Sequence, residues 1–168
     1  KSVIREESLL EGPLETTNEM YAISKISGIK LCQALRAQYN FDAISLMPTN
    51  LYGPNDNYHP LNSHVVPSLI RKFSIAKRDN LSSVTCWGSG LVRRELMHVD
   101  DLAEAAIFCL ENWFPSDIGA PKDNSGNPLN YLNVGTGKDI TIQELAQKIA
   151  NIVKFDGEIL WNKNMPDG

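Results

Sequence analysis

Residues 21–54 have the sequence YAISKISGIKLCQALRAQYNFDAISLMPTNLYGP, in which a long helical pattern leads into a short apolar run and a polar loop. The helix is predicted to begin at Thr17 or Asn18, either of which can act as its N-cap, and to end near Tyr39. The largely apolar residues 41–47 then predict a strand. A helix that leads into a strand in this way is one unit of an α/β fold.

Apolar residues cover too wide an arc of this helix for an ordinary surface helix. They form two stripes, Ala22, Ile26 and Ile29 on one side and Gly28, Leu31, Leu35 and Tyr39 on the other. Because one stripe must face the sheet, we expect the other to meet a second subunit, with Gly28 permitting close approach. The pattern therefore predicts a homodimer through this helix.

Helices and strands continue to alternate along the rest of the chain. After the polar loop 48–62, we expect a helix capped by Asn62 or Ser63 that runs to about Lys77. Further expected elements are a strand 84–87, a turn 88–90, an extended segment 91–99, a helix capped by Asp100 or Asp101 that ends near Trp113, and an exposed insertion 114–128. The last are a strand 129–134, a helix that opens with a capping box at 141–144 and ends near Lys154, and a strand 158–161.

The composition is that of an ordinary globular domain or part of one, with 42% of the 168 residues hydrophobic and 21% charged. The 16 basic and 20 acidic side chains are mixed along the chain and give a net charge of −4, which argues against nucleic acid as a partner. No apolar run approaches the roughly 18 residues of a membrane span, so we expect no membrane contact. Since the chain begins at Lys1 without a methionine and ends at Gly168, we expect it to be part of a longer polypeptide.

The cysteines are odd in number and far apart, at Cys32, Cys86 and Cys109. This spacing predicts neither a disulfide framework nor a metal site, and it favours a reduced protein in the cytoplasm. The histidines His59 and His98 do not cluster with His64 along the sequence, so no metal is expected.

Tyr21 and Lys25 stand four residues apart on the predicted helix, which places both side chains on one face about one turn apart. An ammonium group stabilises a nearby phenolate, so such a pair is suited to proton transfer in a reductase. Taken alone, the pair is a weak signal, and the alternative interpretation is a solvated helix face.

The order of three signals strengthens the catalytic interpretation. The Tyr21/Lys25 pair, the strand 43–47 and the heptad Pro48–Pro54 follow one another as they do in short-chain dehydrogenases, and the heptad resembles the extended, sugar-nucleotide-modifying branch of that superfamily. Within this branch the chain resembles the GDP-L-fucose synthase family from about Pro13 to Gly168. The blocks that carry this resemblance are 48–54, 62–67, 87–90, 94–101 and 133–137.

The block Asn62–Pro67 discriminates among the related enzymes, because dehydratases and 4-epimerases share the Tyr/Lys pair and the block 94–101. The resemblance implies the C-terminal part of a Rossmann-like extended short-chain dehydrogenase together with a small α/β substrate-binding region. We expect residues 1–60 to end the dinucleotide-binding domain and residues 61–168 to form mainly the sugar-nucleotide-binding region. Residues 91–135 are expected to return partly to the Rossmann sheet.

The resemblance also implies catalytic roles. Tyr21 would donate a proton to the C4 oxygen of a GDP-4-keto-6-deoxy-sugar during reduction by NADPH, and Lys25 would assist it and hold the nicotinamide ribose. His64 would act as an acid-base group in epimerisation at C3 and C5, where hydrogens are acidic beside the C4 ketone. A lone histidine at a helix start is more often a structural cap or a core residue, and only the resemblance favours catalysis here.

Binding roles are implied for two further sets of residues. The cofactor set is Tyr21, Lys25, Pro48, Thr49, Asn50, Leu51 and His64. The set for the GDP-sugar substrate is Lys72, Trp87, Arg94 and Asp167. Lys72 could equally be a solvated residue of its helix, and Trp87 could be a core aromatic.

The family's catalytic serine and partner cysteine lie just before the matched segment, and Cys32 and Cys86 are better interpreted as small buried hydrophobic residues. The preference for NADPH over NADH is inherited from the resemblance. Because a glycine-rich dinucleotide-binding turn is missing, we expect residues 1–168 alone to be inactive. Two alternatives stay open: another NAD(P)-dependent sugar-nucleotide epimerase or dehydratase, and a non-catalytic nucleotide-binding homologue.

Overall fold

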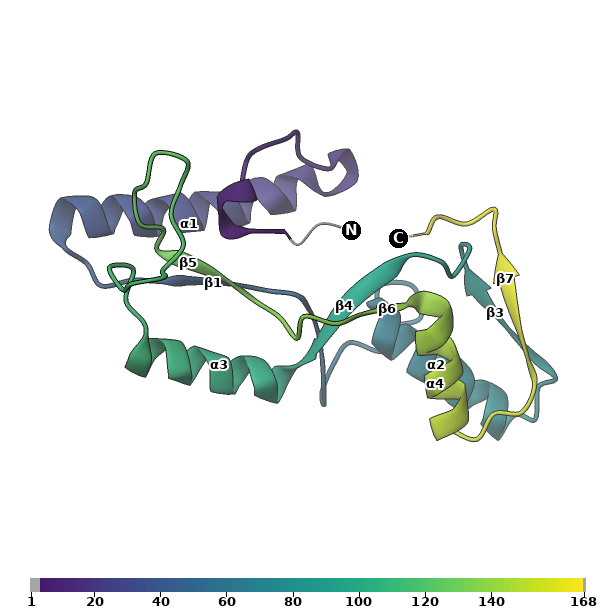
Figure 1. The fold of residues 1–168 in the computed structure, drawn as a ribbon. Coiled ribbons are helices and arrows are strands. Elements are labelled where there is room, and N and C mark those ends of the chain that lie inside the picture. The colour runs from purple at the N-terminus through teal and green to yellow at the C-terminus, as the bar shows by residue number, and fades with distance from the viewer. Residues whose placement is uncertain (1–3, 168) are drawn as a thin grey trace. The chain divides into compact units, whose positions relative to one another are not determined.

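The computed structural model describes residues 4–167 (Figure 1). The chain folds into two compact units. One holds the chain up to Thr49 together with Asp101–Val134, and the other holds Asn50–Asp100 together with the chain from Gly135 onward. Both contain helices and parallel strands, which confirms the expected α/β class.

In the first unit, a long helix packs on a two-stranded parallel sheet. Helix α1 spans Glu19–Tyr39, and strand β1 (Ser45–Pro48) pairs with β5 (Tyr131–Val134). Most of α3 (Val99–Asn112) also belongs here, as do the short 3-10 helices Glu6–Ser8 and Thr16–Asn18. Buried Ile29 of α1 clusters with Tyr131 of β5 and with Leu129, which precedes that strand.

Helix α1 confirms the predicted helix, and its two stripes differ in exposure. Ile29 is buried, whereas Leu31 and Tyr39 are exposed and the space around Gly28 is open. The predicted strand 41–47 is wrong at its start, because β1 begins only at Ser45. Asn40 ends α1 in the left-handed conformation, and Arg36 holds the following residues through Asp42 at 2.7 Å and the Ala43 carbonyl at 3.3 Å.

The second unit is built around two helices and short strands. Helix α2 spans Val65–Arg78 and α4 spans Ile142–Ile152. Strand β4 (Arg93–His98) lies between β2 (Asn50–Tyr52), its parallel neighbour, and β6 (Asp139–Thr141), its antiparallel one. Strands β3 (Ser83–Trp87) and β7 (Glu158–Asn162) form a separate parallel pair.

The core of the second unit lies between α2, α4 and β3. Its largest fully buried side chain is Phe73 of α2, whose ring packs 5.6 Å from that of Phe155, measured between centroids. Leu69, Ala146 and Ile149 are buried in the same cluster. Apolar residues spaced three and four apart along α2 and α4 therefore fix which faces of the helices turn inward.

Most predicted elements of this unit are present, and the differences concern helix ends and short strands. The capping box is confirmed: Thr141 accepts from the Glu144 N–H, and Glu144 accepts from the Thr141 N–H. The predicted cap at Asn62 or Ser63 is wrong, since the N-cap of α2 is His64. The predicted Asp100 or Asp101 cap is also wrong, because α3 follows β4 directly. Strands β2 and β6 were not predicted.

The insertion 114–128 contains no helix or strand and is closed by one isolated bridge between Lys122 and Pro128. Within residues 4–167, no helix combines the length and the apolar character that crossing a membrane demands.

Candidate functional site

The first unit carries Tyr21 and Lys25 on the exposed side of α1. The Lys25 Nζ lies 5.3 Å from the centre of the Tyr21 ring, as the four-residue spacing predicted. Tyr21 as a whole residue is 60% exposed. Ser24 donates its hydroxyl to the Tyr21 carbonyl at 2.7 Å and takes no part in this pair.

The segment Pro48–Leu51 connects the two units, with the end of β1 before it and β2 after it. The backbone N–H of Thr49 donates to the Val134 carbonyl at 3.0 Å, and the Asn50 side chain donates to the Glu95 carbonyl at 3.2 Å. The Thr49 hydroxyl is buried and has no hydrogen-bond partner. A buried hydroxyl of this kind is costly unless a further group completes its hydrogen bonding.

His64 begins α2, but its side chain does not cap the helix. Its carbonyl accepts the Ser68 N–H at 3.0 Å, while its exposed imidazole makes no cap hydrogen bond. His64 is therefore not a core histidine, and it occupies the N-cap position through its backbone alone. An exposed ring at the start of a helix can exchange protons with a bound molecule.

Lys72 and Trp87 come together on the second unit. The Lys72 Nζ donates to the Thr85 carbonyl at 3.2 Å and lies 5.4 Å from the centre of the Trp87 ring. Trp87 is 51% exposed, so it is not a core aromatic. We call this pair the cation–aromatic face.

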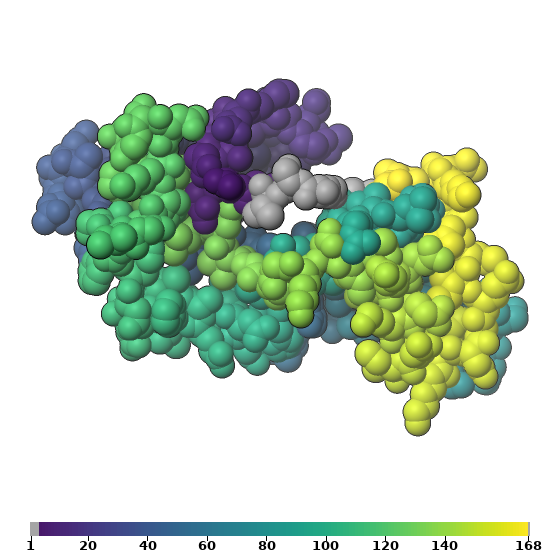
Figure 2. Space-filling model, viewed as in Figure 1, coloured from purple at the N-terminus to yellow at the C-terminus, as the bar shows by residue number. Residues whose placement is uncertain are grey.

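Asp167 reaches the same neighbourhood from the C-terminal segment. Its carboxylate accepts the backbone N–H and the hydroxyl of Ser89, two residues after Trp87. In the space-filling view, the yellow end of the chain lies against the teal segment near residue 90 (Figure 2). Arg94 lies half-buried on β4 and donates to the Arg93 carbonyl at 3.0 Å, among other interactions.

The cysteines add no reactive thiolate to the predicted site residues described above. Cys86 and Cys109 are buried, and burial raises the pKa of the Cys86 thiol, so the thiolate is disfavoured. Cys32 is half-buried on α1. Among residues 4–167, no group of histidine, cysteine and carboxylate side chains could hold a metal ion.

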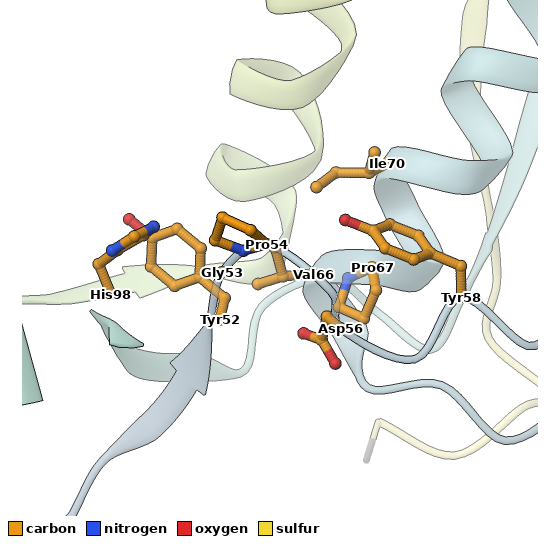
Figure 3. Close-up of a pocket in the computed structure, with 9 residues that line it drawn as sticks. All are labelled: Tyr52, Gly53, Pro54, Asp56, Tyr58, Val66, Pro67, Ile70 and His98. Carbon is orange, nitrogen blue, oxygen red and sulfur yellow. The ribbon is translucent and has the colours of Figure 1, made fainter. Parts of the chain in front are cut away.

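The second unit also contains a pocket of about 320 Å³ that the sequence did not predict. Figure 3 shows the rings of Tyr52 and Tyr58 at its two sides, with Val66 and Pro67 of α2 between them. His98 meets Tyr52 edge to face, with centroids 5.4 Å apart. These residues fall in or beside blocks that carry the family resemblance, yet the resemblance implied no role for any of them, and no predicted site residue lines the pocket.

Of the predicted site residues, the structure therefore brings together Tyr21 with Lys25, and Lys72 with Trp87. Tyr21 and Lys25 belong to the first unit, and His64 and the cation–aromatic face belong to the second.

Comparison with known proteins agrees with this architecture. The profile of the NAD dependent epimerase/dehydratase family matches residues 1–119. The chain is 53% identical to "Probable GDP-L-fucose synthase 1" of Oryza sativa subsp. japonica, over 98% of this chain and 46% of that protein. It is 49% identical to the GDP-L-fucose synthase of Escherichia coli K12, over 100% of this chain and 51% of that protein.

The chain is also similar to a solved structure of a sugar-nucleotide enzyme. The GDP-6-OMe-4-keto-L-xylo-heptose reductase from C. jejuni is 34% identical and superposes with a TM-score of 0.85, covering 99% of this chain and 56% of that one. The chain spans about half the length of the curated relatives it matches. With more than half of its residues matched by the family profile, the chain belongs to the NAD dependent epimerase/dehydratase family.

Proposed function

We propose that the polypeptide containing these residues converts GDP-4-keto-6-deoxy-D-mannose to GDP-L-fucose by 3,5-epimerisation and NADPH-dependent 4-reduction. The names and identities of the relatives support this reaction. The observation that carries it is the exposed imidazole of His64, which lies at the N-cap position of α2 but makes no cap hydrogen bond, so the ring is not committed to the helix. A reductase without epimerase activity has no need of an acid-base group in addition to Tyr21.

Tyr21 and Lys25 perform the reduction in this proposal. Bound NADPH would supply a hydride to C4 of the sugar. The Tyr21 hydroxyl donates a proton to the C4 oxygen, and the Lys25 ammonium stabilises the phenolate that remains. The hydroxyl of Thr49, buried and unpartnered, fits a polar group of the nicotinamide end of the cofactor.

His64 performs proton transfer in the epimerisation. Hydrogens at C3 and C5 are acidic because the C4 ketone stabilises the enolate formed by their removal. An imidazole can both accept and donate a proton, so it can return a proton to one face of the enolate.

The cation–aromatic face and Arg94 bind the sugar nucleotide. Diphosphate is recognised by ammonium and guanidinium donors, and Trp87 offers an exposed apolar ring beside the Lys72 ammonium. Asp167 supports binding from the C-terminal segment. A homodimer through the exposed stripe of α1 and a cytoplasmic location belong to the same proposal.

The test is a product assay with the full-length polypeptide, GDP-4-keto-6-deoxy-D-mannose and NADPH in D₂O. We expect GDP-L-fucose carrying deuterium at C3 and C5, identified by NMR. A product reduced at C4 without deuterium at either carbon would indicate a reductase alone, and no NADPH oxidation would favour a non-catalytic homologue.

A second assay addresses residues 1–168 by themselves. The sequence contains no Gly-x-Gly-x-x-Gly turn for a dinucleotide pyrophosphate. We therefore expect these residues alone to oxidise no NADPH in the presence of the keto-sugar, and measurable oxidation would refute that expectation.

A further inference from the structure

Glu95 of strand β4 contacts two segments that lie far from it along the sequence. Its carboxylate oxygen Oε1 accepts the Gly137 N–H at 2.7 Å and the Thr136 hydroxyl at 3.3 Å. Its backbone carbonyl accepts the side-chain amide of Asn50 at 3.2 Å. Glu95 therefore joins the turn that follows β5 to the first residue of β2.

The turn at residues 135–137 presents its backbone to this carboxylate. Gly137 has φ of 72°, a conformation that side chains disfavour, and a Cβ built there would meet no atom within 4 Å. A hydrogen bond to a carboxylate is stronger than one between neutral groups. Glu95 therefore restrains the turn at a point where side-chain packing does not.

The other end of the turn is tied to the segment that is expected to bind the cofactor. The carbonyl of Val134, the residue before the turn, accepts the Thr49 N–H at 3.0 Å. Thr49 is followed directly by Asn50, whose side chain is held by the carbonyl of Glu95. The hydrogen bonds and the short stretches of chain between them thus form a closed ring of contacts that includes Thr49 and Asn50.

This ring of contacts contains a polar group that needs an exact position. The Thr49 hydroxyl is buried and has no hydrogen-bond partner. Hydrogen bonds weaken steeply outside a narrow range of distances and angles, so this hydroxyl can meet a bound group only if its backbone is held in place. The restraint that Glu95 applies to the turn therefore reaches the residue that carries it.

We propose that Glu95 is a positioning residue, whose carboxylate holds the turn 135–137 and thereby fixes Thr49 and Asn50 for the nicotinamide end of the cofactor, without itself touching cofactor or substrate. This inference rests on the proposed function, since it takes residues 48–51 as part of the cofactor site. Loss of the carboxylate should weaken NADPH binding and spare the sugar nucleotide. A glutamate that only stabilised β4 would affect both, because Arg94 of the same strand is assigned to the sugar nucleotide.

Separate titrations of the full-length polypeptide with NADPH and with GDP test this proposal. Glu95→Ala should raise the dissociation constant of NADPH about tenfold, the scale of one hydrogen bond to a charged group, and should leave that of GDP unchanged. Glu95→Gln keeps an oxygen that can accept the Gly137 N–H, so its NADPH affinity should stay close to the wild-type value. Glu158→Ala, which removes an exposed glutamate from β7, is the matched control and should bind both ligands normally.

A second background tests whether the effect passes through Thr49. Thr49→Val removes the hydroxyl and keeps a side chain of similar size. If Glu95 acts by placing this residue, Glu95→Ala should weaken NADPH binding less in the Thr49→Val protein than in the wild type. Steady-state kinetics of Glu95→Ala should show a raised KM for NADPH and an unchanged KM for the sugar nucleotide, and thermal unfolding checks that every variant is folded at the assay temperature.

Three results would overturn the inference while leaving the proposed function intact. They are equal losses of NADPH and GDP affinity in Glu95→Ala, NADPH binding that is normal in Glu95→Ala or not recovered in Glu95→Gln, and fully additive effects of Glu95→Ala and Thr49→Val. A wild-type protein that binds no NADPH would overturn both.

Discussion

The Lys25 Nζ lies 5.3 Å from the centre of the Tyr21 ring, one helical turn further along α1. An ammonium beside a phenol stabilises the charge that develops when the hydroxyl gives up its proton, which is the role that the proposed function gives to this pair.

Tyr21→Phe removes the hydroxyl and keeps the ring. In the full-length polypeptide we expect kcat for reduction of the keto-sugar to fall by about 10²- to 10⁴-fold, the usual contribution of a general acid. NADPH binding, measured by fluorescence titration, should persist. Tyr39→Phe, at an exposed tyrosine near the end of the same helix, is the control and should retain full activity. Equal activities in the two variants would contradict the assignment.

Lys25→Met keeps a long apolar stem and removes the charge. Because the phenolate then lacks its stabilising ammonium, we expect kcat to fall by about 10²-fold, the size seen when one preorganised electrostatic partner is lost. NADPH oxidation is the measurement. The matched control is Lys30→Met, at an exposed lysine of the same helix, and a comparable loss there would point to helix charge rather than to the pair.

His64→Asn separates catalysis from helix structure. Since the imidazole makes no cap hydrogen bond and Asn is a favourable N-cap residue, the melting temperature should not fall. Deuterium incorporation at C3 and C5 of the substrate in D₂O should drop by about 10²-fold or more. A lowered melting temperature with normal exchange would assign His64 a structural role.

Lys72→Met tests the cation–aromatic face. Loss of the ammonium removes a phosphate donor and the contact with Trp87, so GDP should bind about tenfold more weakly, with kcat little changed. Lys77→Met on the same helix is the control, because Lys77 pairs instead with Asp156 at 3.8 Å. Unchanged GDP affinity in Lys72→Met would place the diphosphate elsewhere.

The capping box of α4 predicts a pH effect on stability. Hydrogen bonds from Thr141, the backbone N–H first, lower the pKa of Glu144 in the folded protein. The ionised Glu144 side chain therefore contributes fully to the free energy of unfolding above the ordinary pKa of glutamate. This contribution is lost as the pH falls through the lowered pKa that Glu144 has in the folded protein. The melting temperature of the wild type should approach that of Glu144→Gln as the pH falls below about 4.5.

Thr141→Ala is the companion variant, because it removes the other half of the box. It should reduce the free energy of unfolding by about 1 kcal/mol. A difference between wild type and Glu144→Gln that stays constant from neutral to acid pH would show that the charge of Glu144 does not support the cap.

Local patterns in the sequence are sufficient to determine several features of this protein. The four-residue spacing of Tyr21 and Lys25 brings their side chains together on any α-helix, and Thr141 with Glu144 forms a capping box wherever a helix begins there. The alternation of helices and strands likewise predicted the α/β class. Each of these depends on residues within about one helical turn of each other or on the periodicity of single elements.

Tertiary structure alone decided the short strands and the side-chain contacts between different elements, because the residues that meet there are far apart along the chain. Strands β2 and β6 are too short to be recognised singly and exist because both pair with β4. Lys72 meets Trp87 because α2 packs on β3, and Asp167 meets Ser89 across 78 residues because β7 pairs with β3. The hydrogen bonds and ring contacts of these residues form only once packing has closed the intervening loops, which no local pattern encodes.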